Sequence, residues 1–344
     1  MITRRAFNKS LAILSSGFIF PDLVGDKEII LGHNNKKYRW DQSWKLHYSD
    51  KNREVKIKDC HEMVCLPEGE MLLLTNDVHN NIIRFDKNGT IISATCSHFQ
   101  GAHGLSLAFD QSNPYLIITD TDLHKVFYTN LSGDILKEIS IPLNTGHYQK
   151  EEEFVPTETV VAANGDLYIA DGYGKQYIIH MDKNGKLINI FGGRGTENKY
   201  LDNAHGICID SRKEQHTLLI TDRNKCCFKR YTLDGEYIAT IEVPGANVCR
   251  PVIKGAYLYA AVLTSNYTSN ANTGFVIVLD NEDHLISCIG GSEPSYDKDN
   301  NLLPSYQTVK LFKHPHDVMV DNDGNLYVCQ WNSGRALPYK FIPV

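Results

Sequence analysis

The sequence has no cluster of lysine and arginine beyond its first few residues, and 35 basic against 41 acidic residues leave a formal charge of −6. Proteins that bind nucleic acid neutralise its phosphates with concentrated positive charge. We therefore expect no nucleic-acid partner. With 42% hydrophobic and 22% charged residues in 344, the composition is that of a folded globular protein. It excludes an intrinsically disordered or collagen-like chain.

The chain also lacks the paired cysteines of a structural zinc site. Its nine cysteines include no C-x-x-C pair, and their odd number leaves at least one thiol free. Cys208 and Cys329 lie inside apolar runs, where cysteine usually acts as a small buried hydrophobic residue. We therefore expect a fold that does not depend on disulfides.

The N-terminal segment has the features of an export signal. Its apolar stretch, residues 11–20, is too short to span a bilayer. Arg4 and Arg5, followed by Phe7 and Lys9, resemble the bacterial twin-arginine signal, which a translocation machinery recognises. The resemblance implies that residues 1–26 direct the folded domain, 27–344, to the periplasm or beyond. No A-x-A cleavage motif follows, so the signal is either removed or kept as an N-terminal anchor.

Three segments of the chain, 115–136, 166–187 and 217–237, are copies of one unit. Asp120, Asp171 and Asp222 follow the apolar run of each copy, at spacings of 51 and 51 residues. Each copy consists of short β-rich runs separated by turn signals such as NG and DG. A period near fifty residues is typical of a β-propeller. Weaker copies occur at 61–92, 251–288 and 314–342.

These six units predict an all-β, six-bladed β-propeller with four antiparallel strands in each blade. The sequence type resembles the NHL-repeat class of propellers. The last unit lacks a fourth strand, and the segment 29–48 is expected to supply it and close the ring, which removes exposed sheet edges. We expect a monomer. The fold alone does not give the function, which must be argued from a site.

Histidines recur at one position of the repeat. His103 and His205 each lie seventeen residues before the repeat aspartate, and His316 has the equivalent position in the last unit. They belong to alternate blades, about 120° apart in a six-fold ring, so we expect the three imidazoles to converge on the channel axis. Three imidazoles with a free position for substrate are typical of a catalytic zinc site. The alternative is a set of channel histidines without metal.

Four short motifs resemble the peptidylglycine α-amidating lyase domain. They are AHGLSL at 102–107, ADGYG at 170–174, AHGIC followed by TDRN at 221–224, and HPHDVMVDNDGNLYV at 314–328. That domain is a six-bladed propeller that cleaves peptidyl-α-hydroxyglycine into an amidated peptide and glyoxylate, with zinc held by three histidines.

The resemblance implies a role for each matching residue. Zinc, or another divalent metal, would be held by His103, His205 and His316. Tyr173 would be the catalytic tyrosine, and Arg223 would bind the substrate carboxylate. A structural calcium would touch Asp317. The chemistry is coherent, because a metal can polarise a hydroxyl, a nearby phenolate can take its proton, and a guanidinium suits a carboxylate.

The first blade departs from the family pattern. The lyase has an essential arginine just past the apolar strand of this blade, where this chain has Asn76. The chain instead has His61 at the ligand-type position, with Asp77 nearby, and His314 replaces a methionine of the family. We count His61 and His314 as candidate catalytic groups, each able to act as a ligand, a general base or a binder of an anion.

Three hypotheses follow. The first is an exported metal-dependent lyase that acts on a small-molecule or peptide-like substrate and cleaves a C–N or C–O bond. The second keeps the metal but has a uronic or other sugar acid as substrate, which the missing first-blade arginine favours. The third is a noncatalytic propeller that binds a protein or a carbohydrate, as many repeat arrays do.

Overall fold

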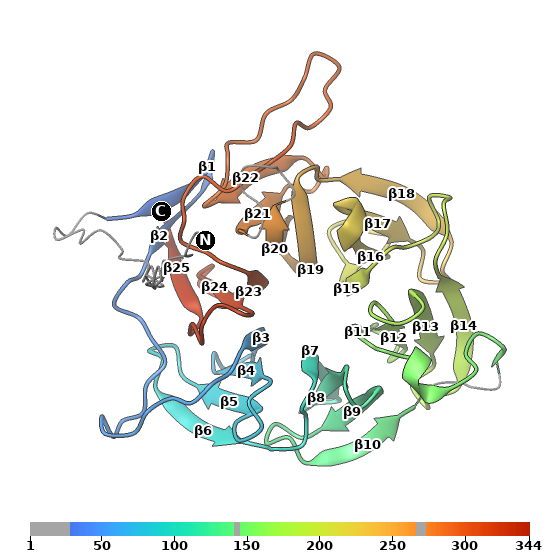
Figure 1. Cartoon of the computed structure of the whole chain (residues 1–344), viewed down its shortest axis with the longest axis horizontal. Helices are drawn as coiled ribbons and strands as arrows, with labels where there is room; N and C mark the ends of the chain where they lie inside the picture. The colour runs from blue at the N-terminus through green and yellow to red at the C-terminus, as the bar shows by residue number, and fades with distance from the viewer. Residues whose placement is uncertain (1–27, 141–144, 266–272) are drawn as a thin grey trace, which may run out of the picture.

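The computed structural model describes residues 28–140, 145–265 and 273–344. The segment predicted as an export signal, 1–26, lies outside the described residues. Six antiparallel sheets stand as blades around a central axis (Figure 1). The predicted all-β, six-bladed propeller is therefore confirmed. Within the described ranges, no helix is long and apolar enough to cross a membrane.

Each blade runs from an innermost strand at the axis to an outer strand at the rim (Figure 1). Blade 1 holds β3 (Cys60–Cys65), β4 (Met71–Thr75), β5 (Ile82–Phe85) and β6 (Ile91–Thr95). Blade 2 holds β7 (Ala102–Asp110), β8 (Asn113–Asp120), β9 (Lys125–Thr129) and β10 (Ile135–Ile139). Blade 3 holds β11 (Glu158–Val161), β12 (Leu167–Ala170), β13 (Tyr177–Met181) and β14 (Leu187–Gly192).

The second half of the ring repeats this order. Blade 4 holds β15 (Ala204–Asp210), β16 (Thr217–Asp222), β17 (Cys227–Tyr231) and β18 (Tyr237–Glu242). Blade 5 holds β19 (Ala246–Lys254), β20 (Tyr257–Ser265), β21 (Phe275–Leu279) and β22 (Leu285–Ile289). Blade 6 holds β23 (Pro315–Val320), β24 (Leu326–Gln330) and β25 (Tyr339–Pro343). Single 3-10 turns occur at η2 (Glu151–Glu153) and η3 (Arg223–Lys225).

The N-terminal part of the domain closes the ring, as predicted. Strand β2 (Lys36–Trp40) pairs with β25, with Trp40 opposite Phe341. Strand β1 (Ile30–His33) pairs with β2 and makes blade 6 a five-stranded sheet, one strand more than expected. The first and last strands of the domain therefore lie in one blade, and the ring cannot open without breaking this pairing.

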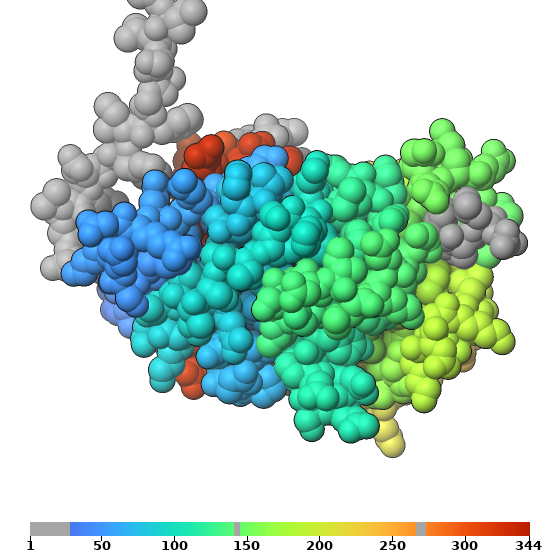
Figure 2. Space-filling view, turned by 90° about the horizontal axis from the view of Figure 1, so that it is seen from below, coloured from blue at the N-terminus to red at the C-terminus, as the bar shows by residue number. Residues whose placement is uncertain are grey.

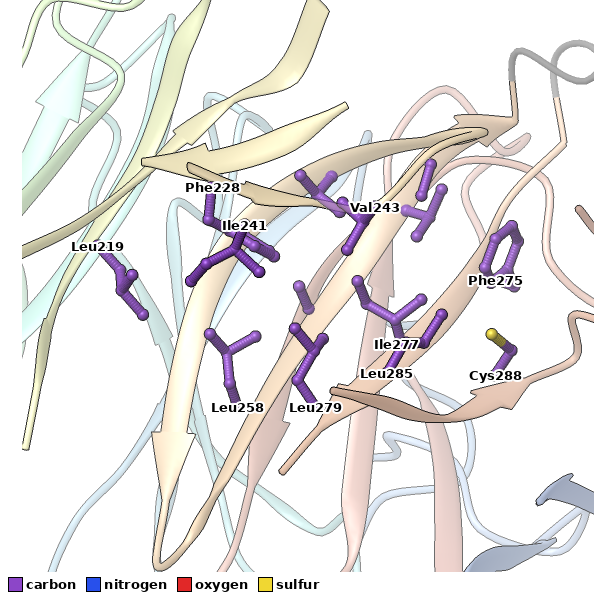
Figure 3. Close-up of a cluster of buried hydrophobic side chains, with 14 residues drawn as sticks. Leu219, Phe228, Ile241, Val243, Leu258, Phe275, Ile277, Leu279, Leu285 and Cys288 are labelled. Atoms are coloured by element: carbon purple, nitrogen blue, oxygen red, sulfur yellow. The ribbon is translucent and has the colours of Figure 1, made fainter. Parts of the chain in front are cut away.

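The hydrophobic core lies between the blades. Figure 3 shows one such layer, in which Leu219, Phe228 and Ile241 of blade 4 face Leu258 and Ile277 of blade 5. Five similar clusters occur among the described residues. Figure 2 views the ring edge-on, with the residues of blades 1 to 3 running from cyan through green to yellow-green. Face-to-face packing of sheets buries the apolar face of every blade.

The repeat aspartates tie each innermost strand to its blade. Asp171 accepts hydrogen bonds from the backbone amide of Val155 at 2.7 Å, from that of Lys175 at 2.6 Å and from the Tyr148 hydroxyl at 2.9 Å. Asp120 accepts from the Gly101 amide, just before β7. Asp222 accepts from the Asp202 amide, just before β15. The even spacing of these aspartates therefore reflects a hydrogen bond from a backbone amide that recurs at the same position in blades 2, 3 and 4.

Burial of Asp171 predicts a pH dependence of stability. Desolvation raises the pKa of this carboxyl to about 6, from an ordinary value of 3.8. Because the folded state holds this proton more tightly than the unfolded state, stability should fall between these pH values as pH rises. The free energy of unfolding of the wild type, relative to that of Asp171→Asn, should fall by up to about 1.4 kcal/mol per pH unit in this range.

Urea unfolding at several pH values measures this slope. Asp182→Asn is a matched control, because Asp182 is a half-buried turn residue of the same blade with a pKa lowered by its hydrogen bonds. That variant should follow the wild type between pH 4 and pH 6. Parallel curves for the wild type and Asp171→Asn over this range would contradict the prediction.

Candidate metal centre

Four histidines lie at the same point of four innermost strands. His61 of β3, His103 of β7, His205 of β15 and His316 of β23 each lie where the register with the second strand shifts. A β-bulge adds a residue to one strand and re-aims its side chain. The bulges explain how strands that run along the channel direct imidazoles toward its axis.

The four imidazoles form one compact cluster. All four residues are at most 4% exposed. The centroid distances are 5.3 Å for His61–His103, 4.9 Å for His61–His316, 4.8 Å for His103–His205, 4.9 Å for His103–His316 and 5.0 Å for His205–His316. The predicted convergence of His103, His205 and His316 is present, and His61 joins it from the first blade.

Backbone carbonyls orient two of these rings. Nδ1 of His103 is 2.9 Å from the Thr157 carbonyl oxygen, and Nδ1 of His316 is 3.2 Å from that of His61. A carbonyl only accepts, so each Nδ1 carries the proton and each Nε2 presents a lone pair. Metal-binding histidines in proteins usually donate their other ring N–H to a carbonyl or carboxylate oxygen in this way.

The other two histidines have nitrogens with no partner. Neither ring nitrogen of His61 or of His205 has a hydrogen-bond partner among the described residues, although all four atoms are buried. An unsatisfied buried polar group is costly, and in native structures it is often explained by an ion or water. Burial also lowers the pKa values of all four histidines, that of His61 to about 3. Neutral imidazoles with free lone pairs fit a metal.

Two overlapping triads of histidines are candidates to hold that metal, and the ligand atoms of one of them are close together. The ligand atoms of His61, His103 and His316 all lie within 4.8 Å of one another. The predicted triad has His205 in place of His61. Its ligand atoms do not form such a group in the described part of the chain, although the His205 ring centroid lies 4.8 and 5.0 Å from those of His103 and His316. His103 and His316 belong to both triads, and the residues present fit a divalent transition metal.

Tyr173 and Arg223 lie beside the cluster, as the sequence motifs suggested. The Tyr173 hydroxyl is 3.1 Å from Nε2 of His103, and Nη1 of Arg223 is 3.5 Å from the same hydroxyl. Because Nδ1 of His103 carries its proton, the phenol donates to Nε2. Arg223 is only 7% exposed and also contacts the Val248 carbonyl. The phenol oxygen therefore lies between a candidate ligand atom and a fixed positive charge.

A cavity of about 390 Å³ opens onto this cluster. Its lining includes His61, His103, His316, Tyr173, Arg223 and Lys58. Lys58 is exposed, and its charge adds to the effect of burial in lowering the pKa of His61. The cavity therefore combines imidazoles and a phenol with two cationic side chains, one from blade 4 and one from the segment before blade 1.

Asn76, at the position of the lyase's first-blade arginine, has a structural role here. Its amide donates to a carboxylate oxygen of Asp59 at 3.1 Å, and its own side-chain oxygen accepts from the Asp59 backbone amide at 3.0 Å. Asp59 is the neighbour of Lys58. The side chain that replaces the arginine thus fixes the segment that brings Lys58 to the cavity. Sequence reasoning missed Lys58, because only the folded loop places it there.

Two of the predicted site residues lie elsewhere. Nδ1 of His314 is 3.3 Å from the Asn332 carbonyl oxygen, its ring packs against Trp331, and the residue is not part of the cavity lining. Asp317 faces Arg250, with one oxygen 2.8 Å from Nη2. His314 is therefore separated from the cavity by Trp331, and the described contacts of Asp317 do not include the histidine cluster.

A charged layer lies one residue beyond the histidine layer. Arg250 of β19 makes ion pairs with Glu62 at 3.2 Å, Glu158 at 3.8 Å and Asp317 at 2.8 Å. It also donates to the carbonyl oxygens of Leu105 and Met63. One guanidinium thus joins blades 1, 2, 3, 5 and 6 at the axis. Sequence reasoning missed it, although an acidic residue follows the ligand-type position in three units.

In blades 2 and 4 a glycine, not an acidic residue, follows the ligand histidine, and neighbouring innermost strands approach it closely. A Cβ atom on Gly206 of blade 4 would lie 2.5 Å from the Cα of Arg250, and one on Gly104 of blade 2 would lie 2.5 Å from the Thr157 carbonyl oxygen. Such contacts leave no space for a side chain. The glycine of the two AHG motifs is therefore required by the close approach of neighbouring innermost strands.

Sequence comparisons with known proteins point to amidating lyases. Peptidyl-α-hydroxyglycine α-amidating lyase 1 of Drosophila melanogaster is 25% identical over 267 residues, which are 71% of this chain and 45% of that protein. A probable peptidyl-α-hydroxyglycine α-amidating lyase of Caenorhabditis elegans is 22% identical over 259 residues, 71% of this chain and 65% of that protein. The chain therefore spans about half to two thirds of these relatives. No family model matches.

Comparison with solved structures supports the fold. A gluconolactonase of Xanthomonas campestris has a TM-score of 0.56 at 12% identity, over 92% of this chain and 95% of that one. Virginiamycin B lyase of Staphylococcus aureus has a TM-score of 0.53 at 13% identity, over 92% and 99% of the two chains. At such low identities the shared property is the propeller architecture.

Proposed function

We propose that this protein is an exported, metal-dependent lyase that cleaves a C–N or C–O bond in a substrate carrying a hydroxyl and a carboxylate. The observation that carries the proposal is the histidine cluster that opens into a cavity together with Tyr173, Arg223 and Lys58. The sequence similarity to amidating lyases favours a peptidyl-α-hydroxyglycine as the first substrate to test. Export through the twin-arginine pathway rests on residues 4–9 alone.

Arg223 and Lys58 suit the carboxylate of such a substrate. Arg223 is held by the Val248 carbonyl and presents a planar guanidinium at the cavity wall, which matches the two oxygens of a carboxylate. Lys58 adds a second, more flexible charge to the same cavity, close enough to His61 to lower the pKa of that imidazole. Two cations in one cavity would orient the substrate so that its hydroxyl faces the imidazoles.

Tyr173 is positioned to move the hydroxyl proton. A metal bound to the histidines would supply a Lewis acid that polarises the substrate hydroxyl. The Tyr173 oxygen is 3.1 Å from Nε2 of His103, so a hydroxyl bound at the cluster lies within its reach. Nη1 of Arg223 lies 3.5 Å from the same oxygen, so a fixed positive charge faces the negative charge that this oxygen carries when it acts as a base.

The reaction balances without an added oxidant or reductant. With Tyr173 as a phenolate, its oxygen takes the proton of the hydroxyl on the α-carbon, and the electrons of that O–H bond form the C=O bond of glyoxylate. The bond between the α-carbon and the amide nitrogen breaks, and the nitrogen keeps its electron pair. That nitrogen then takes up the proton, which gives the amidated peptide and returns Tyr173 to its initial state.

The test is glyoxylate release from an α-hydroxyglycine peptide by protein reconstituted with a divalent metal. We expect turnover that is abolished by a chelator and restored by metal. The same peptide ending in glycine, without the hydroxyl, is the control and should not react. Absence of glyoxylate from the metal-loaded protein would refute the amidating activity.

A sugar-acid substrate is the second candidate. The observation in its favour is the change in the first blade. Asn76 stands where the lyase has an arginine and binds Asp59, and Lys58 supplies this side of the site with a cation in addition to Arg223. A flexible cation with a single nitrogen in place of a planar guanidinium suits a carboxylate at another position in the cavity. Formation of unsaturated product from uronic acids, without glyoxylate from the peptide, would favour this candidate.

A further inference from the structure

We infer that His61 is a fourth metal ligand, so that the centre of the proposed enzyme holds its metal with four imidazoles: His61, His103, His205 and His316. The inference rests on the metal dependence proposed above and specifies its site. It assigns a ligand that the resemblance to amidating lyases does not include. It also changes which metals suit the centre.

His61 shares the structural setting of the other three histidines. It lies in the bulge of an innermost strand, as they do, and its ring is 4% exposed. Its ring contacts those of His103 and His316 at centroid distances of 5.3 and 4.9 Å. Imidazoles that share a metal at about 2.0–2.1 Å from each nitrogen have centroids about 5 Å apart, so His61 is as close as a ligand requires.

The free nitrogens of His61 support the same conclusion. A neutral imidazole has one N–H donor and one acceptor, and neither finds a partner among the described residues although both atoms are buried. Its backbone carbonyl, by contrast, is used: it holds Nδ1 of His316 at 3.2 Å. The first blade therefore contributes to the cluster twice, through a carbonyl that orients one ligand and through a ring that lacks any other partner.

His61 and His205 flank the shared pair from two sides. Each ring contacts both His103 and His316, and no contact between the rings of His61 and His205 accompanies them in the described part of the chain. The four imidazoles come from blades 1, 2, 4 and 6, and the ligand atoms of His61, His103 and His316 lie within 4.8 Å of one another. Either triad leaves one of these two histidines with both ring nitrogens unpartnered, whereas a single four-ligand centre gives one nitrogen of each ring a partner.

Four imidazoles favour a metal that accepts five or six ligands. Zinc in a tetrahedral site with four protein ligands has no position for substrate. Iron, cobalt and nickel also bind imidazole and take larger coordination numbers. With such a metal, the four histidines would leave positions free toward the cavity that Tyr173 and Arg223 line.

The test counts the imidazoles around the metal and measures its affinity. X-ray absorption of the cobalt- or nickel-loaded wild type should give four imidazole nitrogens. In competition with a chelator, His61→Ala and His205→Ala should each weaken metal binding by about 100-fold or more, beyond what loss of an outer partner causes. His79→Ala, an exposed histidine of the same blade with 81% side-chain exposure, is the matched control and should bind like the wild type.

The outcomes separate this inference from the proposed reaction. Three imidazoles in the absorption spectrum, or unchanged affinity in His61→Ala, would overturn the fourth ligand while leaving lyase activity to be judged by glyoxylate release. Four imidazoles in a protein that releases no glyoxylate would support the ligand and reject the reaction. The absorption measurement uses the wild type, so its result does not depend on whether a variant folds.

Discussion

Replacement of Arg250 by methionine is expected to lower the free energy of unfolding by about 3–5 kcal/mol, the cost of breaking a buried ion pair by removing one partner. The side chain of Arg250 is 12% exposed, and those of Glu62, Glu158 and Asp317 are at most 1% exposed. Methionine fills a similar volume but leaves three buried acidic side chains without a positive charge beside them. Two carbonyl oxygens also lose their donor.

Urea unfolding measures this effect, with Arg39→Met as the matched control. Arg39 pairs with Glu28 on the surface, where its side chain is 35% exposed, so its loss should cost no more than about 1 kcal/mol. Arg250→Lys should fall between the two, since it keeps the charge but not the planar fork. Equal stability of Arg250→Met and Arg39→Met would contradict the role assigned to Arg250.

The contacts between Arg250 and Asp317 also bear on the structural calcium expected at Asp317. Carboxylate and carbonyl oxygens are the ligands that calcium prefers, and Arg250 already contacts both oxygens of Asp317. If the guanidinium takes the place of the ion, calcium should not stabilise the wild type. If calcium binds there as the resemblance implies, its addition should raise the denaturation midpoint of the wild type.

Replacement of Tyr173 by phenylalanine is expected to lower turnover by about 10²–10⁴-fold, the usual contribution of a positioned general base. The substitution removes only the hydroxyl, which lies 3.1 Å from His103 and 3.5 Å from Arg223. Because Tyr173 is 42% exposed, packing should change little. The loss should appear in kcat rather than in metal content, which separates proton transfer from assembly of the site.

Tyr177→Phe is the control for this substitution. Tyr177 belongs to the same blade but packs against His147 and Tyr148, away from the cavity. It should keep full activity with the best substrate of the wild type. Full turnover in Tyr173→Phe would remove the phenol from the mechanism and leave a histidine outside the metal shell, or a water, as the base.

The repeat made the fold predictable from the sequence. Asp120, Asp171 and Asp222 are buried acceptors of backbone amides at one position of each blade, so their even spacing reports the architecture directly. The closing strand was predictable because the last unit had no fourth strand of its own. The extra strand β1 was not, because nothing in its four residues distinguishes an added edge strand from a loop.

The site was only partly predictable. His103 and His205 could be recognised because each is followed by a glycine that the neighbouring blade requires, at Gly104 and Gly206. His61 lies in the same bulge but is followed by Glu62, so its motif looks different. The residue that follows the ligand-type position is acidic in three blades, because these acidic side chains face Arg250. Without knowledge of that charged layer, the acidic residue after His61 could not be recognised as part of the same pattern.

Contacts between distant blades could not be predicted from the sequence repeat. Arg250 is 67 residues from Asp317 and 187 from Met63, and it meets them only at the axis of the closed ring. Lys58 reaches the cavity through a loop that Asn76 and Asp59 fix. Such pairings depend on ring geometry, which a periodic pattern predicts in outline but not at the level of side chains.

The most direct test of a metal enzyme at this site is elemental analysis of the protein purified without chelator, beside His103→Ala/His316→Ala. These two histidines belong to both triads, so their loss should remove the metal whichever set binds it. We predict close to one equivalent of a divalent transition metal in the wild type and none in the double variant. Absence of metal from the wild type, even after incubation with cobalt, nickel or zinc, would contradict this account.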